Sequence, residues 1–214
     1  RVDEVPSYQL EDVQQGVSLL PLPPPLRERM SFDGYEILRS IYVSSRSHVF
    51  LARDMDSNEL VVIKTPSAEL SDDATYLESF MLEDWIAKRL NNPYVVKAIE
   101  SPRQRQFLYL ATEYIEGQSL AQWMIDNPKP TLEQTRDIIS QIANGLQAFH
   151  RKSMIHQDIR PANIMIDKHG IVKIIDFGST YIAGVSNTKD EEVLRGTMRY
   201  SAPEYFLGHA GSER

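Results

Sequence analysis

The chain has 214 residues, 42% of them hydrophobic and 25% charged, and it contains no cysteine. Its net charge of −7 argues against a nucleic-acid-binding surface, which requires a basic face, and the lack of cysteine excludes disulfides and thiolate metal sites in this chain. The sequence contains neither an apolar run that could span a bilayer nor a signal-peptide pattern, so we expect a cytoplasmic protein with no membrane segment and no nucleic-acid partner.

The first 31 residues predict a connecting segment. We expect residues 1–19 to be the tail of a preceding domain, because the chain begins with Arg1 and ends at Arg214 like a piece of a longer polypeptide. Residues 20–31 contain the run Leu-Pro-Leu-Pro-Pro-Pro-Leu, and proline favours a stiff, extended linker that lacks backbone donors. A docking site for a proline-binding domain is the alternative interpretation of this run.

Residues 32–112 predict a sheet with one helix. Ser71 is a candidate N-cap for that helix, which is expected to end near Leu90. Five of its apolar residues recur at roughly helical spacing and are expected to be buried: Leu77, Phe80, Met81, Ile86 and Leu90. Runs of β-branched, aromatic and other apolar residues predict five strands, over 35–38, 49–52, 60–64, 95–100 and 107–114.

Residues 113–117 predict a short connector, and residues 118–214 predict a mainly helical region. Ser119–Asp126 is expected to form a short helix and Thr131–His150 a long one that starts with a Thr-x-x-Gln capping box. The long helix carries an apolar stripe that we expect to be buried, made of Leu132, Ile138, Ile139, Ile142, Leu146 and Phe149.

Two polar motifs in this region carry the functional signal, each beside a short predicted strand. The first is His-Gln-Asp-Ile-Arg-Pro-Ala-Asn at 156–163, and the second is Ile-Ile-Asp-Phe-Gly at 174–178. Together they supply two acids and an amide. Phosphoryl transfer needs one carboxylate that orients the attacking hydroxyl, and an amide and a second carboxylate that hold Mg²⁺ on the nucleotide phosphates. Asp-Phe-Gly alone is common by chance, but two motifs in this order are much more specific.

The two motifs resemble the catalytic and metal-binding loops of eukaryotic-like protein kinases. The resemblance implies the α+β, two-lobed kinase fold, with an N-lobe of antiparallel sheet plus one helix over 32–112, a hinge over 113–117 and an apparently truncated helical C-lobe over 118–214. It also implies ATP-dependent, Mg²⁺-assisted phosphoryl transfer to Ser or Thr of protein substrates. The alternatives are a pseudokinase that regulates a linked domain and, less favoured, a kinase of small molecules.

The resemblance assigns roles to the residues of the two motifs. Asp158 would accept the proton of the substrate hydroxyl, and Arg160 would meet the γ-phosphate. Asn163 and Asp176 would coordinate Mg²⁺ through their oxygen atoms. Thr197 would belong to the loop that docks the peptide, with Ala-Pro-Glu at 202–204 closing that segment.

The resemblance also assigns a nucleotide-binding set to the first half of the chain. Lys64, which ends a Val-Val-Ile-Lys run, would hold the α- and β-phosphates and pair with Glu83, with Glu78 as the next candidate. Tyr42, Ser44 and Ser47 stand at the three glycine positions of the phosphate loop, so nucleotide binding is expected to be weak. The adenine-binding set would comprise Val49, Val62 and Met165 against the ring, Thr112 at the back, and Glu113, Tyr114 and Ile115 at the hinge.

Gln157 and the proline-rich junction lead to two further expectations. Gln157 replaces the arginine that receives the activation-loop phosphate in the family, so we expect activity to depend less on such a switch. The proline-rich junction and the two loops around Ser-Ser-Arg-Ser-His and His-Gln-Asp-Ile-Arg-Pro are similar to bacterial proteins in which a PPM-type phosphatase precedes the kinase. A covalently linked phosphatase domain is therefore an expected partner.

Overall fold

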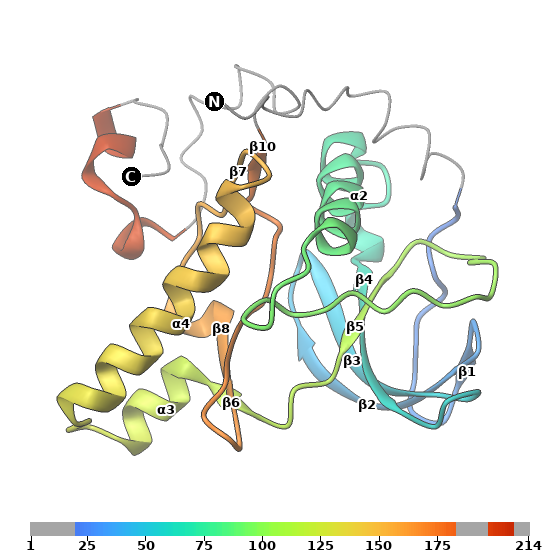
Figure 1. Ribbon diagram of the computed structural model, residues 1–214. Helices are drawn as coiled ribbons and strands as arrows, with labels where there is room; N and C mark the ends of the chain where they lie inside the picture. Colours follow the sequence, from blue (N-terminus) through green and yellow to red (C-terminus); the bar gives the residue numbers. More distant parts are fainter. Residues whose placement is uncertain (1–19, 183–196, 208–214) are drawn as a thin grey trace. The chain divides into compact units, whose positions relative to one another are not determined.

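The computed structural model describes residues 20–182 and 197–207 (Figure 1). The described residues form two compact units: one contains 20–89 and 97–114, and the other contains 90–96, 115–182 and 197–207. The first unit is a sheet with one long helix, and the second contains two helices and short strands, as predicted for an α+β kinase-like fold. The predicted tail over residues 1–19 lies outside the described residues.

The first unit is built on a five-stranded antiparallel sheet with the order β1-β2-β3-β4-β5 (Figure 1). Three strands extend beyond the predicted runs over 35–38, 49–52 and 60–64, whereas the last is shorter than the predicted run over 107–114. The strands are β1 (Ser31–Phe32), β2 (Tyr35–Val43), β3 (Ser47–Asp54), β4 (Leu60–Pro66) and β5 (Leu110–Glu113).

One face of this sheet forms the core of the first unit. Side chains alternate between the two faces of a strand, so alternate residues at the start of β2 and along β3 and β4 are buried here. The Phe32 and Tyr109 rings meet edge to face with their centroids 5.1 Å apart. The buried set comprises Phe32, Tyr35, Ile37, Phe50, Ala52, Val61, Ile63, Tyr109 and Ala111.

The proline-rich segment is attached to this core. Leu26 and Met30 pack against the buried set, and the backbone N–H of Leu108 donates to the carbonyl oxygen of Pro21 at 2.9 Å. Proline removes donors from a segment but leaves its carbonyl groups free to accept, as Pro21 does. The predicted boundary between a linker and a kinase lobe at residues 31 and 32 stays a prediction.

The long helix α2 (Ala74–Arg89) follows β4 after a single 3₁₀ turn, η1 (Ala68–Leu70). The predicted N-cap, Ser71, is wrong: Ser71 closes η1, and the carboxylate of Asp73 accepts the N–H of Tyr76 at 3.0 Å. Aspartate is as good an N-cap as serine, and it lies directly before the first helical residue. Phe80, Ile86 and Leu90 are buried as predicted, whereas Leu77 and Met81 are only partly covered.

The predicted strand over 95–100 is also wrong. Val95 and Ala98 form isolated bridges only, Val95 with Ile174 and Ala98 with Thr112. The first bridge belongs to the second unit and the other to the first unit. The chain therefore changes pairing partners within three residues and cannot build a continuous ladder, although its apolar run is typical of a strand.

The second unit contains two helices and two small sheets. Helix α3 (Leu120–Asp126) is capped by Ser119, and α4 (Leu132–His150) starts with the predicted capping box, in which Thr131 and Gln134 each accept the other's backbone N–H. One sheet has the order β6 (Gly117–Ser119), β8 (Ile164–Asp167) and β9 (Val172–Ile174), and the other pairs β7 (Met154–Ile155) with β10 (Tyr181–Ile182). Short 3₁₀ turns complete the unit: η2 (Pro161–Asn163), η4 (Met198–Tyr200) and η5 (Pro203–Leu207).

Helix α4 packs on β9 through a face that includes polar and small residues. Gln141 donates to the carbonyl of Gly170 at 3.1 Å and accepts the N–H of Val172 at 2.8 Å, so one amide clamps the β8–β9 turn to the helix. A Cβ at Gly145 would lie 2.8 Å from Cδ1 of Ile174, which shows how closely the helix approaches the strand. Phe149 completes this buried face.

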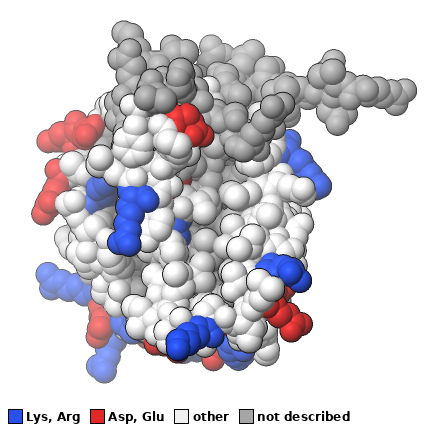
Figure 2. Space-filling model, turned by 90° about the vertical axis from the view of Figure 1, so that its left-hand side faces the viewer, with Lys and Arg blue, Asp and Glu red and all other residues white. Residues whose placement is uncertain are grey.

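The predicted buried stripe of α4 is wrong at two positions. Leu132 is 74% exposed and Ile139 is 60% exposed, because the helix turns Gln141 and Gly145 toward the sheet and Leu132 and Ile139 away from it. Figure 2 looks onto the side where α4 lies in Figure 1, and it shows a broad uncharged area with basic and acidic side chains scattered around it. Among the described residues, no helix is long and apolar enough to cross a membrane.

Candidate active site

The second face of the first unit's sheet carries the predicted nucleotide-binding residues. Directly paired residues of antiparallel strands point to the same face. Val49 pairs with Lys64, and Tyr42 pairs with Val49. Val62 pairs with Thr112 and lies two residues before Lys64, so it belongs to the same face. Strand register therefore brings these predicted residues together on the face opposite the buried core.

Lys64 is fixed by the helix that faces it. Its Nζ donates to both carboxylate oxygens of Glu83 on α2, at 2.6 and 2.8 Å. The Lys64 side chain is 19% exposed and that of Glu83 is 5% exposed. A buried carboxylate is stable only with such a partner. The pairing falls on Glu83 and not on the alternative, Glu78.

The β2–β3 hairpin stands where the resemblance places the phosphate loop. Ser44 closes its turn: its Oγ accepts the N–H groups of Arg46 at 3.3 Å and Ser47 at 3.1 Å, and its hydroxyl donates to the carbonyl of Ser47 at 3.1 Å. Two of the loop's backbone donors are thus bonded within the loop. Tyr42 is 59% exposed.

Tyr76 on α2 anchors the tip of this hairpin. Its hydroxyl donates to the carbonyl oxygen of Arg46 and accepts the N–H of Ser67 at 3.1 Å. The Arg46 guanidinium lies over the Tyr76 ring, 5.3 Å from its centroid. Burial raises the pKa of the Tyr76 phenol, so the hydroxyl stays protonated and able to donate. No motif in the sequence pointed to Tyr76.

The predicted hinge residues lie at the end of β5 and just beyond it. Glu113 donates its N–H to the carbonyl of Lys97 at 2.9 Å, and its carboxylate accepts the N–H of Lys97 at the same distance. Ile115 belongs to the second unit and is buried. Gly117 follows in β6, where a Cβ would lie 2.0 Å from the carbonyl oxygen of Ile166. Met165, on β8, is half-buried and pairs with Ser119.

The first polar motif forms a compact hydrogen-bonded loop in the second unit. Asn163 donates its amide to the carboxylate of Asp158 at 2.8 Å and to the backbone carbonyl of the same residue at 2.9 Å. Arg160 Nε lies 3.4 Å from the same carboxylate oxygen, Oδ2. The other oxygen, Oδ1, accepts the backbone N–H of Thr197 at 2.8 Å. Asp158 therefore has donors on both oxygens.

A buried cluster of aromatic rings packs around His156 at the start of this loop. His156 is 2% exposed, and its ring meets those of Phe149 and Phe177 at 5.3 and 6.4 Å. Its Nδ1 accepts the N–H of Asp158 at 3.3 Å. Burial lowers the pKa of His156 even though Asp176 and Asp158 oppose the shift, so the ring is neutral and acts as an acceptor. It supports the loop through this hydrogen bond and through its ring contacts.

Asn163 and Asp176, the residues expected to hold Mg²⁺, each form hydrogen bonds within their own loop. Because the amide nitrogen of Asn163 is bonded to Asp158, the Asn163 Oδ1 is the atom left for a metal. Asp176 has a left-handed backbone with φ of 68°, and it accepts the N–H of Gly178 at 3.3 Å. The described residues contain no cluster of three His, Cys, Asp or Glu side chains able to hold a metal. Mg²⁺ uses few protein oxygens together with phosphate and water, so one amide oxygen and one carboxylate would suit it.

Comparison with known proteins identifies the family. The profile of the protein kinase domain matches residues 35–213. The chain belongs to the protein kinase domain family. Among curated relatives, the serine/threonine-protein kinase PknA of Corynebacterium glutamicum is 32% identical over 188 residues, and PrkC of Bacillus subtilis is 29% identical over 181 residues. A serine/threonine-protein kinase of Corynebacterium efficiens, drp72, is 32% identical over 168 residues.

The alignments cover most of the kinase chain but only part of each relative. They include 86% of the chain for PknA, 84% for PrkC and 76% for drp72. The chain spans 40%, 28% and 32% of the lengths of those three proteins. Family membership confirms the predicted kinase fold, and protein kinase domains in general use ATP and Mg²⁺.

Proposed function

We propose that this chain is the catalytic part of a protein serine/threonine kinase that uses ATP and Mg²⁺. The observation that carries the proposal is the Lys64–Glu83 ion pair, with the nitrogen bonded to both carboxylate oxygens. A lysine held in this way keeps its charge in a fixed position, which suits the α- and β-phosphates. The curated relatives described above are named serine/threonine-protein kinases, which supports protein Ser or Thr as the acceptor.

We assign the remaining roles to the loop residues. Asp158 orients the Ser or Thr hydroxyl of the substrate and takes its proton as the oxygen attacks the γ-phosphorus. Arg160, already beside Asp158, contributes positive charge for the γ-phosphate. Asn163 and Asp176 hold Mg²⁺, which neutralises phosphate charge during transfer. The adenine is assigned to Val49, Val62, Thr112, Glu113, Tyr114, Ile115 and Met165.

A pseudokinase is the second candidate function. It is favoured by the closed β2–β3 loop, in which the N–H groups of Arg46 and Ser47 already bond to Ser44 and are therefore less available to phosphate. The complete set of acids, amide and lysine favours catalysis instead. A covalently linked PPM-type phosphatase domain stays a prediction, supported only by the sequence of the junction and loops. A cytoplasmic location also stays a prediction.

Phosphoryl transfer by the protein that carries this chain tests the proposal. We expect Lys64→Met and Asp176→Ala to lower the transfer of radiolabelled phosphate from ATP to a generic basic protein by roughly 10³ or more, as for other electrostatic contributions to phosphoryl transfer. Lys168→Met is the matched control, because Lys168 pairs with Glu116 at an exposed site. Unchanged transfer in Lys64→Met would disprove the proposed role. ATP binding without transfer in the parent would favour the pseudokinase.

A further inference from the structure

The loop over residues 101–106 presents two arginines to two different elements of the first unit. Arg103 and Arg105 are two residues apart, and each guanidinium forms an ion pair with a largely buried aspartate. Each also lies over a tyrosine ring, Arg103 over Tyr35 at 5.0 Å and Arg105 over Tyr109 at 4.8 Å. The two arginine side chains, called arms below, form similar contacts but bind different elements.

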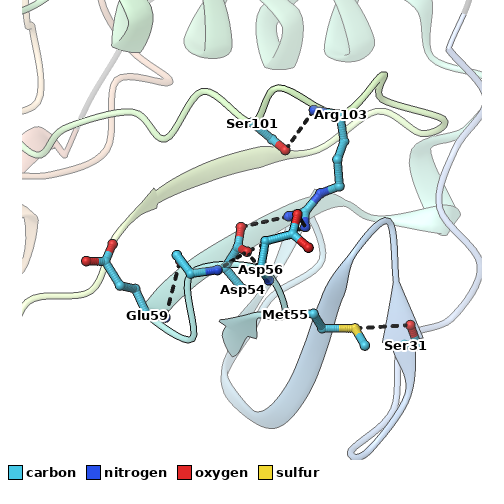
Figure 3. Close-up of polar contacts among 8 residues, drawn as sticks. Ser31, Asp54, Met55, Asp56, Glu59, Ser101 and Arg103 are labelled. Carbon is cyan, nitrogen blue, oxygen red and sulfur yellow. Dashed lines mark hydrogen bonds and ion pairs between the residues drawn. The ribbon is translucent and has the colours of Figure 1, made fainter.

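Arg103 holds a turn of the sheet. Its Nη2 donates to Asp54 Oδ2 at 2.7 Å, and its Nη1 pairs with Asp56, as Figure 3 shows. Asp54 ends β3 and accepts the N–H groups of Asp56 at 2.8 Å and Ser57 at 3.2 Å. This arm therefore fastens the β3–β4 turn, which lies at the opposite end of β4 from Lys64.

Arg105 holds helix α2. Its two terminal nitrogens donate to the two carboxylate oxygens of Asp84 at 3.1 Å each, and Nη1 also donates to the carbonyl of Tyr109 at 2.9 Å. The Asp84 side chain is 3% exposed. Lys88 adds a third donor at 2.6 Å from the next turn of the helix. A two-pronged bond of this kind fixes direction as well as distance.

We propose that Arg105 and Asp84 are positioning residues that keep Glu83 bonded to Lys64. Asp84 is the neighbour of Glu83 on α2, and successive residues of a helix are about 100° apart. Fixing the direction of Asp84 toward Arg105 therefore fixes the direction in which Glu83 leaves the helix. If this bond is lost, α2 is free to turn or shift, and Lys64 loses the carboxylate that orients it. The inference rests on the proposed function, because it assigns Lys64 to the phosphates.

Calorimetric titration of the protein that carries this chain can distinguish a positioning role of Arg105 and Asp84 from a contribution to stability alone. ATP with Mg²⁺ depends on Lys64, whereas adenosine has no phosphate to meet it. We expect Arg105→Met and Asp84→Asn to reduce the preference for ATP over adenosine by about tenfold, the size expected for a lost bond to a charged group. Arg105→Lys keeps the charge but cannot bond to both oxygens of Asp84 through two nitrogens. Its preference for ATP over adenosine should therefore lie between those of the parent and Arg105→Met.

Arg103→Met is the matched control, because it removes an equivalent arm from the same loop. It should lower the melting temperature by an amount similar to Arg105→Met while changing the ATP preference by less than about twofold. An equal loss of preference in both variants, or no loss in either Arg105→Met or Asp84→Asn, would overturn the positioning role. A parent protein that binds neither ATP nor adenosine would instead refute the proposed function on which the inference depends.

Discussion

The buried carboxylates of the first unit show what single residues contribute. Asp54, Glu83 and Asp84 are each buried, and each is bonded to at least one cation. Removing one partner from such a pair is costly, because it leaves an unpaired charge away from water. The family resemblance predicted that Glu83 pairs with Lys64, with Glu78 as the next candidate. It could not predict the partners of Asp54 and Asp84, which lie 49 and 21 residues away.

Asp54 should make stability sensitive to acid. Burial by itself would raise the pKa of Asp54, but the N–H groups of Asp56 and Ser57 and the Arg103 guanidinium lower it below the usual value. The unfolded state therefore takes up a proton first, near pH 4, and stability falls as the pH drops further through the folded-state pKa. We expect Asp54→Asn to be less stable than the parent at pH 7 and to lose less stability between about pH 4 and pH 2. Urea unfolding at several pH values measures the stability at pH 7 and its change with pH. If stability changed with pH equally in the variant and the parent, the prediction would be contradicted.

Helix α4 shows how an element is placed by contacts that its own pattern does not reveal. Its limits and its capping box were predicted correctly, because both depend on local sequence. The face that it buries was predicted only in part: Phe149 is buried as expected, but Gln141 and Gly145, which are also buried, did not belong to the predicted apolar stripe. Gln141 bonds to the β8–β9 turn, and Gly145 allows the helix to come close to Tyr94 and Ile174.

Gly145→Ala should destabilise the protein although alanine is the better helix former. Alanine gains about 1 kcal/mol in helix propensity. Its Cβ, however, would lie 2.8 Å from Cδ1 of Ile174 and 3.0 Å from the carbonyl oxygen of Tyr94, and overpacking typically costs about 1–3 kcal/mol. We expect a net loss of roughly 1 kcal/mol in denaturant unfolding. Gly170→Ala is the control at an open position, with only its φ of 82° to oppose the substitution. A stabilised Gly145→Ala would show that the helix can move away from the strand.

Segments whose structure depends on local sequence were predicted better than segments that depend on distant partners. The strands around Lys64 and the loop over 156–163 were predicted from their residues, because strand alternation and the motif are both local. The segment over 95–100 was not, since its pairing depends on two partners in different units. The anchoring of the β2–β3 loop by Tyr76 was missed for a similar reason: a single tyrosine 30 residues from its carbonyl partner leaves no periodic signal.

At the scale of the whole molecule, each of the two units carries part of the predicted site. The first holds Lys64 and Glu83, and the second holds Asp158, Asn163 and Asp176. Several large apolar side chains of the second unit are exposed, in addition to those of α4: Met124 by 52% and Ile125 by 71%. Single exposed apolar residues are ordinary, but several of them on two successive helices favour association.

We therefore expect these 214 residues alone to self-associate. Replacing Leu132 and Ile139 with lysine should reduce association without unfolding the protein, because these side chains are 74% and 60% exposed and contribute little to the interior. Sedimentation measurements at several concentrations would detect the change. Leu120→Lys, at a buried position of α3, should unfold the unit and increase aggregation. Equal association of the parent and the double variant would show that these two residues do not drive it.

The closed β2–β3 loop has a consequence for the thermodynamics of ligand binding. A glycine-rich loop keeps many backbone conformations until a ligand selects one, and that selection weakens binding. Here Ser44 closes the turn and Tyr76 anchors it, so the loop has already lost this freedom when the chain folds. If the chain binds a nucleotide as proposed, ordering the loop would add little to the entropy change of binding. The affinity lost through fewer free backbone donors would thus be regained in part, because the loop is already ordered before the ligand binds.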